Sequence, residues 1–167
     1  MIHPTCGEVL ATIQTGFADQ IVPHLVPAEA RSAAATIGHL LRHVALRIES
    51  EGQMLFDDVR RLESLLGRIA AWFEASSASD AEVIRIVLAE DLPPDCWPGP
   101  ALLGERALAL RGVLVAAQDE LHRLAASHGK DPAYVMLRQA IRGYIAAQLE
   151  DEARLIAPAF QGQGPRR

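Results

Sequence analysis

The sequence predicts an all-α protein, a helical bundle of four long helices plus one or two shorter ones. Apolar residues recur every three or four positions along most of the chain, which is the period of one face of a helix. We find no convincing strand pattern. Half of the 167 residues are hydrophobic, which is enough for a buried core at this length. We therefore expect one domain over residues 1–160 and a flexible tail over 161–167.

Two helices are expected in the first fifty residues, over 5–21 and 28–51. In the first helix an apolar residue stands at every fourth position: Val9, Ile13, Phe17 and Ile21. Pro23 ends or kinks this helix, because proline cannot continue the hydrogen-bond ladder. Pro27 suits the first turn of the second helix. Gly52 is expected to end that helix, since glycine commonly follows the last turn.

Four further helices complete the expected bundle, over 55–74, 81–90, 101–127 and 132–156. The segment 91–100 has four prolines in ten residues and is predicted to be a loop. Gly129 and Asp131 mark a stop and a new N-cap. The expected core consists of the apolar stripes of these helices: Val9, Ile13, Phe17, Ile37, Leu41, Val44, Ile48, Leu62, Leu66, Ile69, Leu110, Leu114, Leu121, Ile141, Ile145 and Leu149.

Composition and charge exclude several classes of protein. The net charge of −5 provides no basic field for nucleic acid. No apolar run reaches about 18 residues, so we expect no membrane span. The N-terminus, "MIHPTCGEVL", has no basic region followed by an apolar one, so we expect no signal peptide. Cys6 and Cys96 share no motif and are interpreted as free thiols in a reducing cytoplasm rather than as a disulfide.

The stretch "TIGHLLRHVALRIESE", residues 36–51, carries apolar residues on two faces. On a helical wheel Ile37, Leu41, Val44 and Ile48 fall within about 60° of one another and are interpreted as the core stripe. The opposite side mixes Leu, Ala and His where a plain surface helix would be polar. It is predicted to be an interface made of Ala35, His39, Leu40, Arg42, His43 and Leu46. Either another helix of this chain or another chain covers it.

A metal site on the same helix is disfavoured. Histidines at i and i+4, such as His39 and His43, can share one metal ion. A di-metal bundle would also need Glu-x-x-His pairs, and the sequence has none; the nearest pattern is Asp119-x-x-His122. Motifs of nucleophile elbows, phosphate-binding loops and dinucleotide sites are absent as well. We therefore expect no metal, no cofactor and no catalytic residues, although an enzyme remains an alternative.

Three stretches resemble a family of small helical bacterial proteins whose domain has no known function. They are "HPTCGEVLATIQTGFADQIVPHL", "EARSAAATIGHLLRHVALRIESE" and, near the end, "LEDEARLIAPAF". The likeness covers about residues 2–66 and 134–160. Members of that family are encoded beside aminoglycoside-phosphotransferase-like kinases and acyl-CoA dehydrogenases. The resemblance implies an accessory subunit of a kinase that acts in acyl-CoA and hydroxy-acid catabolism, and it supplies no catalytic residues.

Three hypotheses of function follow from the sequence. The first is a non-catalytic accessory or regulatory subunit that binds a kinase-like protein. The second is a helical-bundle enzyme with a metal or a buried ligand. The third is a homo-oligomeric helical protein whose second face meets its own copy. Metal analysis separates the second hypothesis from the others, and size measurement with and without the kinase-like protein separates the first from the third.

Overall fold

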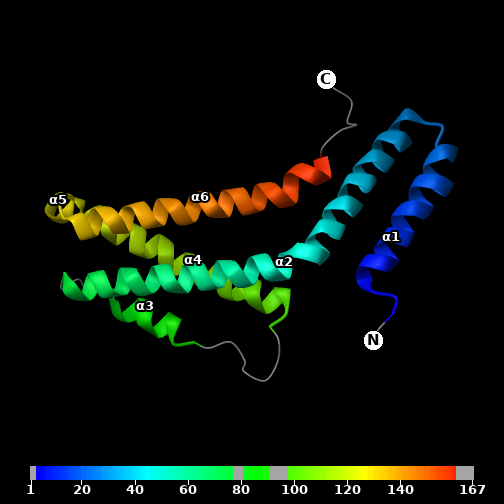
Figure 1. Cartoon of the computed structure of the whole chain (residues 1–167). Helices are drawn as coiled ribbons and strands as arrows, with labels where there is room; N and C mark the ends of the chain where they lie inside the picture. Colours follow the sequence, from blue (N-terminus) through cyan, green and yellow to red (C-terminus); the bar gives the residue numbers. More distant parts are fainter. Residues whose placement is uncertain (1–2, 77–80, 91–97, 161–167) are drawn as a thin grey trace. The chain divides into compact units, whose positions relative to one another are not determined.

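The computed structural model describes residues 3–76, 81–90 and 98–160, with no side-chain detail after residue 157. Within these ranges the chain is an all-α helical bundle without strands, as predicted (Figure 1). The elements are α1 (Cys6–Gly16), the π-helical turn η1 (Phe17–Ile21), the 3-10 turn η2 (Val22–His24), α2 (Ala28–Ala75), α3 (Ala81–Leu88), α4 (Pro100–Arg123), α5 (Ala125–His128) and α6 (Pro132–Phe160). Most of the expected proline-rich loop and the whole expected tail lie outside the described residues.

The chain divides into two compact units, and the single domain over residues 1–160 stays a prediction. Unit 1 comprises residues 1–52 and 150–167, and unit 2 comprises residues 53–149. The boundaries fall inside α2 and α6, so each of these helices contributes to both units. The units differ in how many hydrophobic residues they bury.

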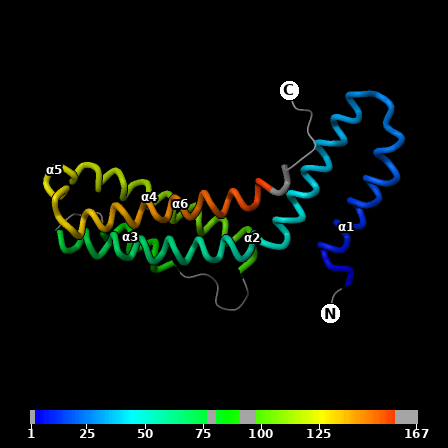
Figure 2. Tube along the Cα trace, turned by 45° about the horizontal axis from the view of Figure 1, so that its top comes forward, coloured from blue at the N-terminus to red at the C-terminus, as the bar shows by residue number. Residues whose placement is uncertain are grey.

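Unit 2 contains the hydrophobic core. The parts of α2, α4 and α6 that belong to it lie along one another in both views, with α3 beside α4 (Figures 1 and 2). Seven predicted core residues are buried here: Leu62, Leu66, Ile69, Leu110, Leu114, Leu121 and Ile141. The predictions for Ile145 and Leu149 are wrong, because both are exposed. Tyr144 takes the inward position of α6 one turn after Ile141, which turns Ile145 outward.

An aromatic group closes one end of this core. The ring of Trp72 lies 5.8 Å from that of Phe73, 5.5 Å from that of Tyr134 and 5.3 Å from that of His128. The indole nitrogen of Trp72 donates a hydrogen bond to Asp131 Oδ2 over 3.4 Å. Asp131 Oδ1 also accepts from the backbone N–H of Ala133 over 2.9 Å. This confirms Asp131 as the cap of α6 and ties the start of that helix to the core.

Unit 1 contains a helical hairpin made of α1 and the first part of α2 (Figure 2). A capping box begins α1: Thr5 Oγ1 accepts from the Glu8 N–H over 3.2 Å, and Glu8 Oε2 accepts from the Thr5 N–H over 2.6 Å. Among the described hydrophobic residues of the unit, only Leu10 and Ala34 are buried. The hairpin therefore has very little core of its own.

The predicted core stripes of unit 1 are not buried. Five of these residues are exposed, namely Val9, Ile13, Ile37, Val44 and Ile48, and Phe17 and Leu41 are half-buried. The prediction that they form core is wrong for this unit. Periodicity correctly identifies an apolar stripe, but no described element covers it.

The predicted helix end at Gly52 is also wrong. The expected helices over 28–51 and 55–74 are one continuous helix of 48 residues, α2. No atom outside the local helix backbone lies within 4 Å of the position that a Cβ at Gly52 would occupy. A glycine inside a helix costs about 1 kcal/mol relative to alanine, which a helix of this length tolerates.

Candidate functional site

The predicted interface residues of α2 lie in three different environments. The first contains Ala35, His39 and Arg42, which line a hollow of about 290 Å³ opposite Phe17 and Val22. Arg42 Nη2 donates to His39 Nδ1 over 2.7 Å. This part of the predicted interface therefore lines a hollow beside the turns η1 and η2, and Ala35 and Arg42 remain exposed.

His43 and Leu46 occupy the second environment, and both are half-buried. His43 Nδ1 lies 3.2 Å from the carbonyl oxygen of Leu155, a residue of α6 that belongs to the same unit. The imidazole donates to this carbonyl and so joins α2 to the C-terminal part of α6 within unit 1. The two histidines are therefore engaged by different partners, Arg42 and the Leu155 carbonyl, and do not converge.

Leu40 is the residue of the predicted interface that lies among other exposed large aliphatic side chains. Its exposed fraction is 54 %. Five other aliphatic residues of the hairpin are between 44 and 51 % exposed. We define the hairpin apolar face as Val9 and Ile13 of α1 together with Ile37, Leu40, Val44 and Ile48 of α2.

Both arms of the hairpin contribute to one side of it. On the helical wheel of α2, the residues of the hairpin apolar face lie on one side of the buried Ala34. Gly38 and Arg42 lie on the other side of Ala34. On the helical wheel of α1, Val9 and Ile13 lie on one side of the buried Leu10, and Gln14 lies on the other side. Gln14, Gly38 and Arg42 line one hollow of about 350 Å³, so they share a side. Because α1 and the first part of α2 are antiparallel, the residues on the opposite side of each wheel then lie together on the other side of the hairpin. These are the residues of the hairpin apolar face.

An ion pair borders this face. Arg47 donates a hydrogen bond from Nη2 to Glu51 Oε1, one turn further along α2. The hydrogen bond from Arg47 lowers the pKa of Glu51, and the same bond raises the pKa of Arg47. On the helical wheel this pair lies next to Leu40 and Val44. The face thus has an apolar centre and a charged edge, which is the usual anatomy of a protein–protein interface.

The buried charges of unit 2 form a separate polar network. Asp58 accepts from Arg111 Nη2 over 2.7 Å and from the Tyr144 hydroxyl over 3.0 Å. Arg106 donates to the Val87 carbonyl over 2.8 Å and to Glu63 Oε1 over 3.1 Å. No buried side-chain nitrogen or oxygen of the described residues lacks a hydrogen-bond partner. These charged side chains therefore all have hydrogen-bond partners, and the bonds join α2, α3, α4 and α6.

Sequence reasoning did not single out this network. Asp58 lies one turn before Leu62, and Arg106 one turn before Leu110, so both charges stand on apolar stripes of their helices. A charge on such a stripe is a signal of buried pairing. The partner of each charge, however, depends on how the helices pack.

Comparisons with known proteins identify no relative. No family model matches the chain, and no curated protein or solved structure matches it either. Among the described residues, no three histidine, cysteine, aspartate or glutamate side chains lie close enough to hold a metal ion. None of the described helices has an apolar stretch that could cross a membrane.

Proposed function

We propose that this protein acts by binding another protein, as a non-catalytic accessory subunit, through the hairpin apolar face. One observation carries the proposal: six aliphatic side chains on one side of the hairpin are about half exposed, while unit 1 buries only Leu10 and Ala34 among its described hydrophobic residues. The partner is the kinase-like protein that the sequence resemblance implies. A monomer gains nothing from an exposed apolar ridge of this regularity.

The size of the face bounds what its apolar burial contributes to binding. Full burial of an aliphatic side chain contributes about 1.5–3 kcal/mol, so burying the exposed half of each of these six contributes roughly 4–9 kcal/mol in total. Association costs about 4–15 kcal/mol in lost motion. The apolar face therefore supports binding only together with contacts at its charged edge, where Arg47 and Glu51 lie.

The experiment compares Val44→Asp with Val115→Asp. Val44 lies on the hairpin apolar face, whereas Val115 is an exposed residue of α4 in unit 2, 59 % exposed. The molar mass of each variant is measured by light scattering, alone and mixed with a purified kinase-like protein of the class that the resemblance implies. We expect the wild type and Val115→Asp to form the complex and Val44→Asp to lose it while keeping its helical circular dichroism.

Two results would overturn the proposal. Retention of the complex by Val44→Asp would place the contact elsewhere. A wild type that is a dimer alone, is dissociated by Val44→Asp and ignores the kinase-like protein would replace the accessory subunit with a homo-oligomer.

A further inference from the structure

The hairpin apolar face consists of two rows of residues with the period of a helix. The row of α2 has an aliphatic residue at every third or fourth position: Ile37, Leu40, Val44 and Ile48. In the row of α1, Val9 and Ile13 are four residues apart, and Gly16 is the next position on the same side of the helix. The six aliphatic side chains are between 44 and 54 % exposed, so both rows are open to a partner.

Two other sides of this part of α2 already have neighbours within unit 1. Ala34 is buried and lines a hollow with Phe17 at the end of the other arm. His43 meets the C-terminal part of α6, with its Nδ1 3.2 Å from the Leu155 carbonyl oxygen. On the helical wheel the apolar row of α2 lies between these two contacts. The described residues of unit 1 thus leave this third side about half exposed.

The chemistry of the face favours a helix of another protein as its occupant. Helices pack by placing the side-chain rows of one between the rows of another, and both arms offer such rows. The charges at the edge, Arg47 and Glu51, pair with each other, so the partner needs polar flanks rather than a charged centre. Residues 1–52 contain five carboxylate side chains and three arginines, which disfavours an anionic lipid surface.

Gly16 leaves a gap in the row of α1. The next residue, Phe17, lines two hollows together with Gly38 of α2, so Gly16 lies at about the level of Leu40. A Cβ at Gly16 would meet no heavy atom within 4 Å outside its neighbours and the local helix. Gly16 also lines a hollow of about 430 Å³ with Thr12. Leu40 therefore stands at a level where the other arm has no side chain, which leaves space for a large group of the partner.

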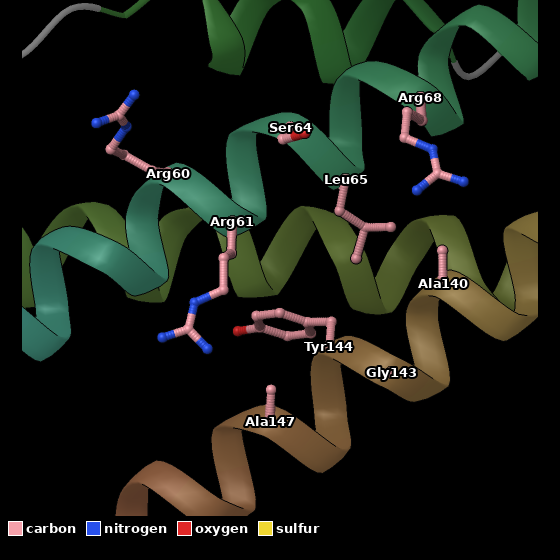
Figure 3. Close-up of a pocket in the computed structure, with 9 residues that line it drawn as sticks. All are labelled: Arg60, Arg61, Ser64, Leu65, Arg68, Ala140, Gly143, Tyr144 and Ala147. Carbon is pink, nitrogen blue, oxygen red and sulfur yellow. The ribbon is translucent and has the colours of Figure 1, made fainter.

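The pocket between α2 and α6 of unit 2 is a weaker docking surface (Figure 3). It measures about 410 Å³. Leu65, which projects into it, is only 5 % exposed, and Arg61 Nε already donates to the Asp57 carbonyl over 3.3 Å. A partner would bury little new apolar surface there, whereas the hairpin apolar face offers six half-exposed aliphatic side chains.

We propose that the partner covers the hairpin apolar face with one amphipathic α-helix, laid along both arms, whose large apolar side chain fills the space over Gly16 beside Leu40. This helix completes a three-helix bundle with α1 and the first part of α2. The inference rests on the proposed protein-binding function. It adds which kind of element of the partner binds and where its largest contact residue lies.

Synthetic peptides test the face without the partner. The row of α2 spans eleven residues, or about 16 Å, so the probe is a peptide of about eighteen residues with one stripe of leucines over three turns. Phenylalanine replaces the last leucine of the stripe in one probe and the first in another, so that both directions along the hairpin are tested. A control peptide of the same composition distributes its leucines around the helix. Calorimetric titration with the full chain measures binding, and difference circular dichroism measures the helix gained.

Variants of α1 locate the large side chain. The backbone of Gly16 is α-helical, with φ −61° and ψ −39°, so leucine is compatible with it. We expect Gly16→Leu to weaken binding of the better probe on the order of tenfold, because the space is filled. The same variant should bind a probe with alanine in place of phenylalanine more tightly than the wild type does.

The matched control is Ala11→Leu, which adds a leucine to an exposed position on the far side of α1. It should leave the affinity of both probes unchanged, and Val44→Asp should abolish their binding. Far-ultraviolet circular dichroism checks that each variant stays helical. Gly16→Ala repeats the comparison with a smaller side chain if Gly16→Leu loses helix.

Three outcomes would reject the covering helix. These are equal binding of the probes and the control peptide, affinities that the Gly16 variants leave unchanged, and a bound peptide that gains no helix. Phosphatidylcholine vesicles that bind the wild type but not Val44→Asp, while no peptide binds, would identify a lipid surface instead.

The same measurements separate this inference from the proposed function. Loss of the kinase-like complex in Val44→Asp together with failed peptide binding would reject the covering helix and retain the proposed function. Peptide binding that depends on Gly16, with a kinase-like complex that Val44→Asp leaves intact, would retain the helix-binding site and reject the proposed function.

Discussion

The hydroxyl of Tyr144 donates a hydrogen bond to Asp58 Oδ1 over 3.0 Å and joins α6 to α2 inside unit 2. Arg111 binds the other oxygen of the same carboxylate over 2.7 Å. Burial is the largest cause that raises the pKa of Tyr144, to about 12, and the nearby charge of Asp58 adds to it. The pKa of Arg111 is also raised, since its bonds to Tyr144 and Asp58 outweigh the opposite effect of burial.

Stability should therefore fall at high pH because of Tyr144. Its pKa in the folded chain, about 12, exceeds the ordinary value of about 10, so the folded state holds this proton more tightly than the unfolded state. The contribution is complete below pH ~10 and is lost as the pH rises toward ~12. We expect the difference in unfolding free energy between the wild type and Tyr144→Phe to shrink across that window in urea titrations. A difference that stays constant would contradict the assignment.

Arg106 should be costly to remove. It is 7 % exposed and holds both the Val87 carbonyl and the Glu63 carboxylate. Arg106→Ala should lower the unfolding free energy by about 3 kcal/mol, near the lower end for a broken buried pair, because Glu63 is partly hydrated. Arg106→Met keeps most of the side-chain volume and should therefore lower the unfolding free energy by less. Urea denaturation measures both, and an effect of Arg106→Ala below about 0.5 kcal/mol would show that the pair is not needed.

Two leucines of α2 should respond differently to truncation. Leu66 is fully buried, whereas Leu40 is 54 % exposed. Leu66→Ala should cost about 2–5 kcal/mol through lost burial and a cavity. Leu40→Ala should cost less than about 1 kcal/mol, since little of its apolar surface leaves water on folding. Both costs are measured on dilute protein, and equal costs would contradict the exposure of Leu40 in the monomer.

Alanine at Gly52 should stabilise α2. A helical interior position with no neighbour near the new Cβ gains about 1 kcal/mol in unfolding free energy from Gly→Ala. Gly129→Ala is the contrasting variant, because its Cβ would lie 2.6 Å from the Ala125 carbonyl oxygen, and it should destabilise. Thermal unfolding of the two variants gives the comparison. A destabilising Gly52→Ala would indicate that the helix ends there, as the sequence alone suggests.

The fold class was predictable because it depends on local signals. The period of the apolar residues identifies the helices of unit 2, and Asp131 with Pro132 marks the start of α6. The same signals misplace the end of a helix at Gly52, since a glycine that ends a helix and one inside it look alike in sequence. Local sequence patterns misplace a helix boundary when the residue there changes the free energy of the helix by only about 1 kcal/mol, as glycine does.

The candidate sites were only partly predictable, because they depend on what each side chain faces. A stripe such as Ile37–Val44–Ile48 reads as core whether or not another surface covers it. His43 was assigned to an interface, and in the structure it meets the Leu155 carbonyl of the same unit. Arg61 and Arg68 are seven residues apart in the sequence, and only the packing of α6 beside α2 makes them line one pocket with Tyr144.

The aromatic group around Trp72 has an optical consequence. Both tryptophans and both tyrosines of the chain lie between residues 53 and 149, the range of unit 2, and the remainder contains phenylalanine alone. Tryptophan emission therefore reports the unfolding of unit 2 and does not report the unfolding of the helical hairpin of unit 1. Far-ultraviolet circular dichroism senses the backbone of both units. A transition visible in the dichroism but silent in the emission would be the signature of the hairpin melting by itself.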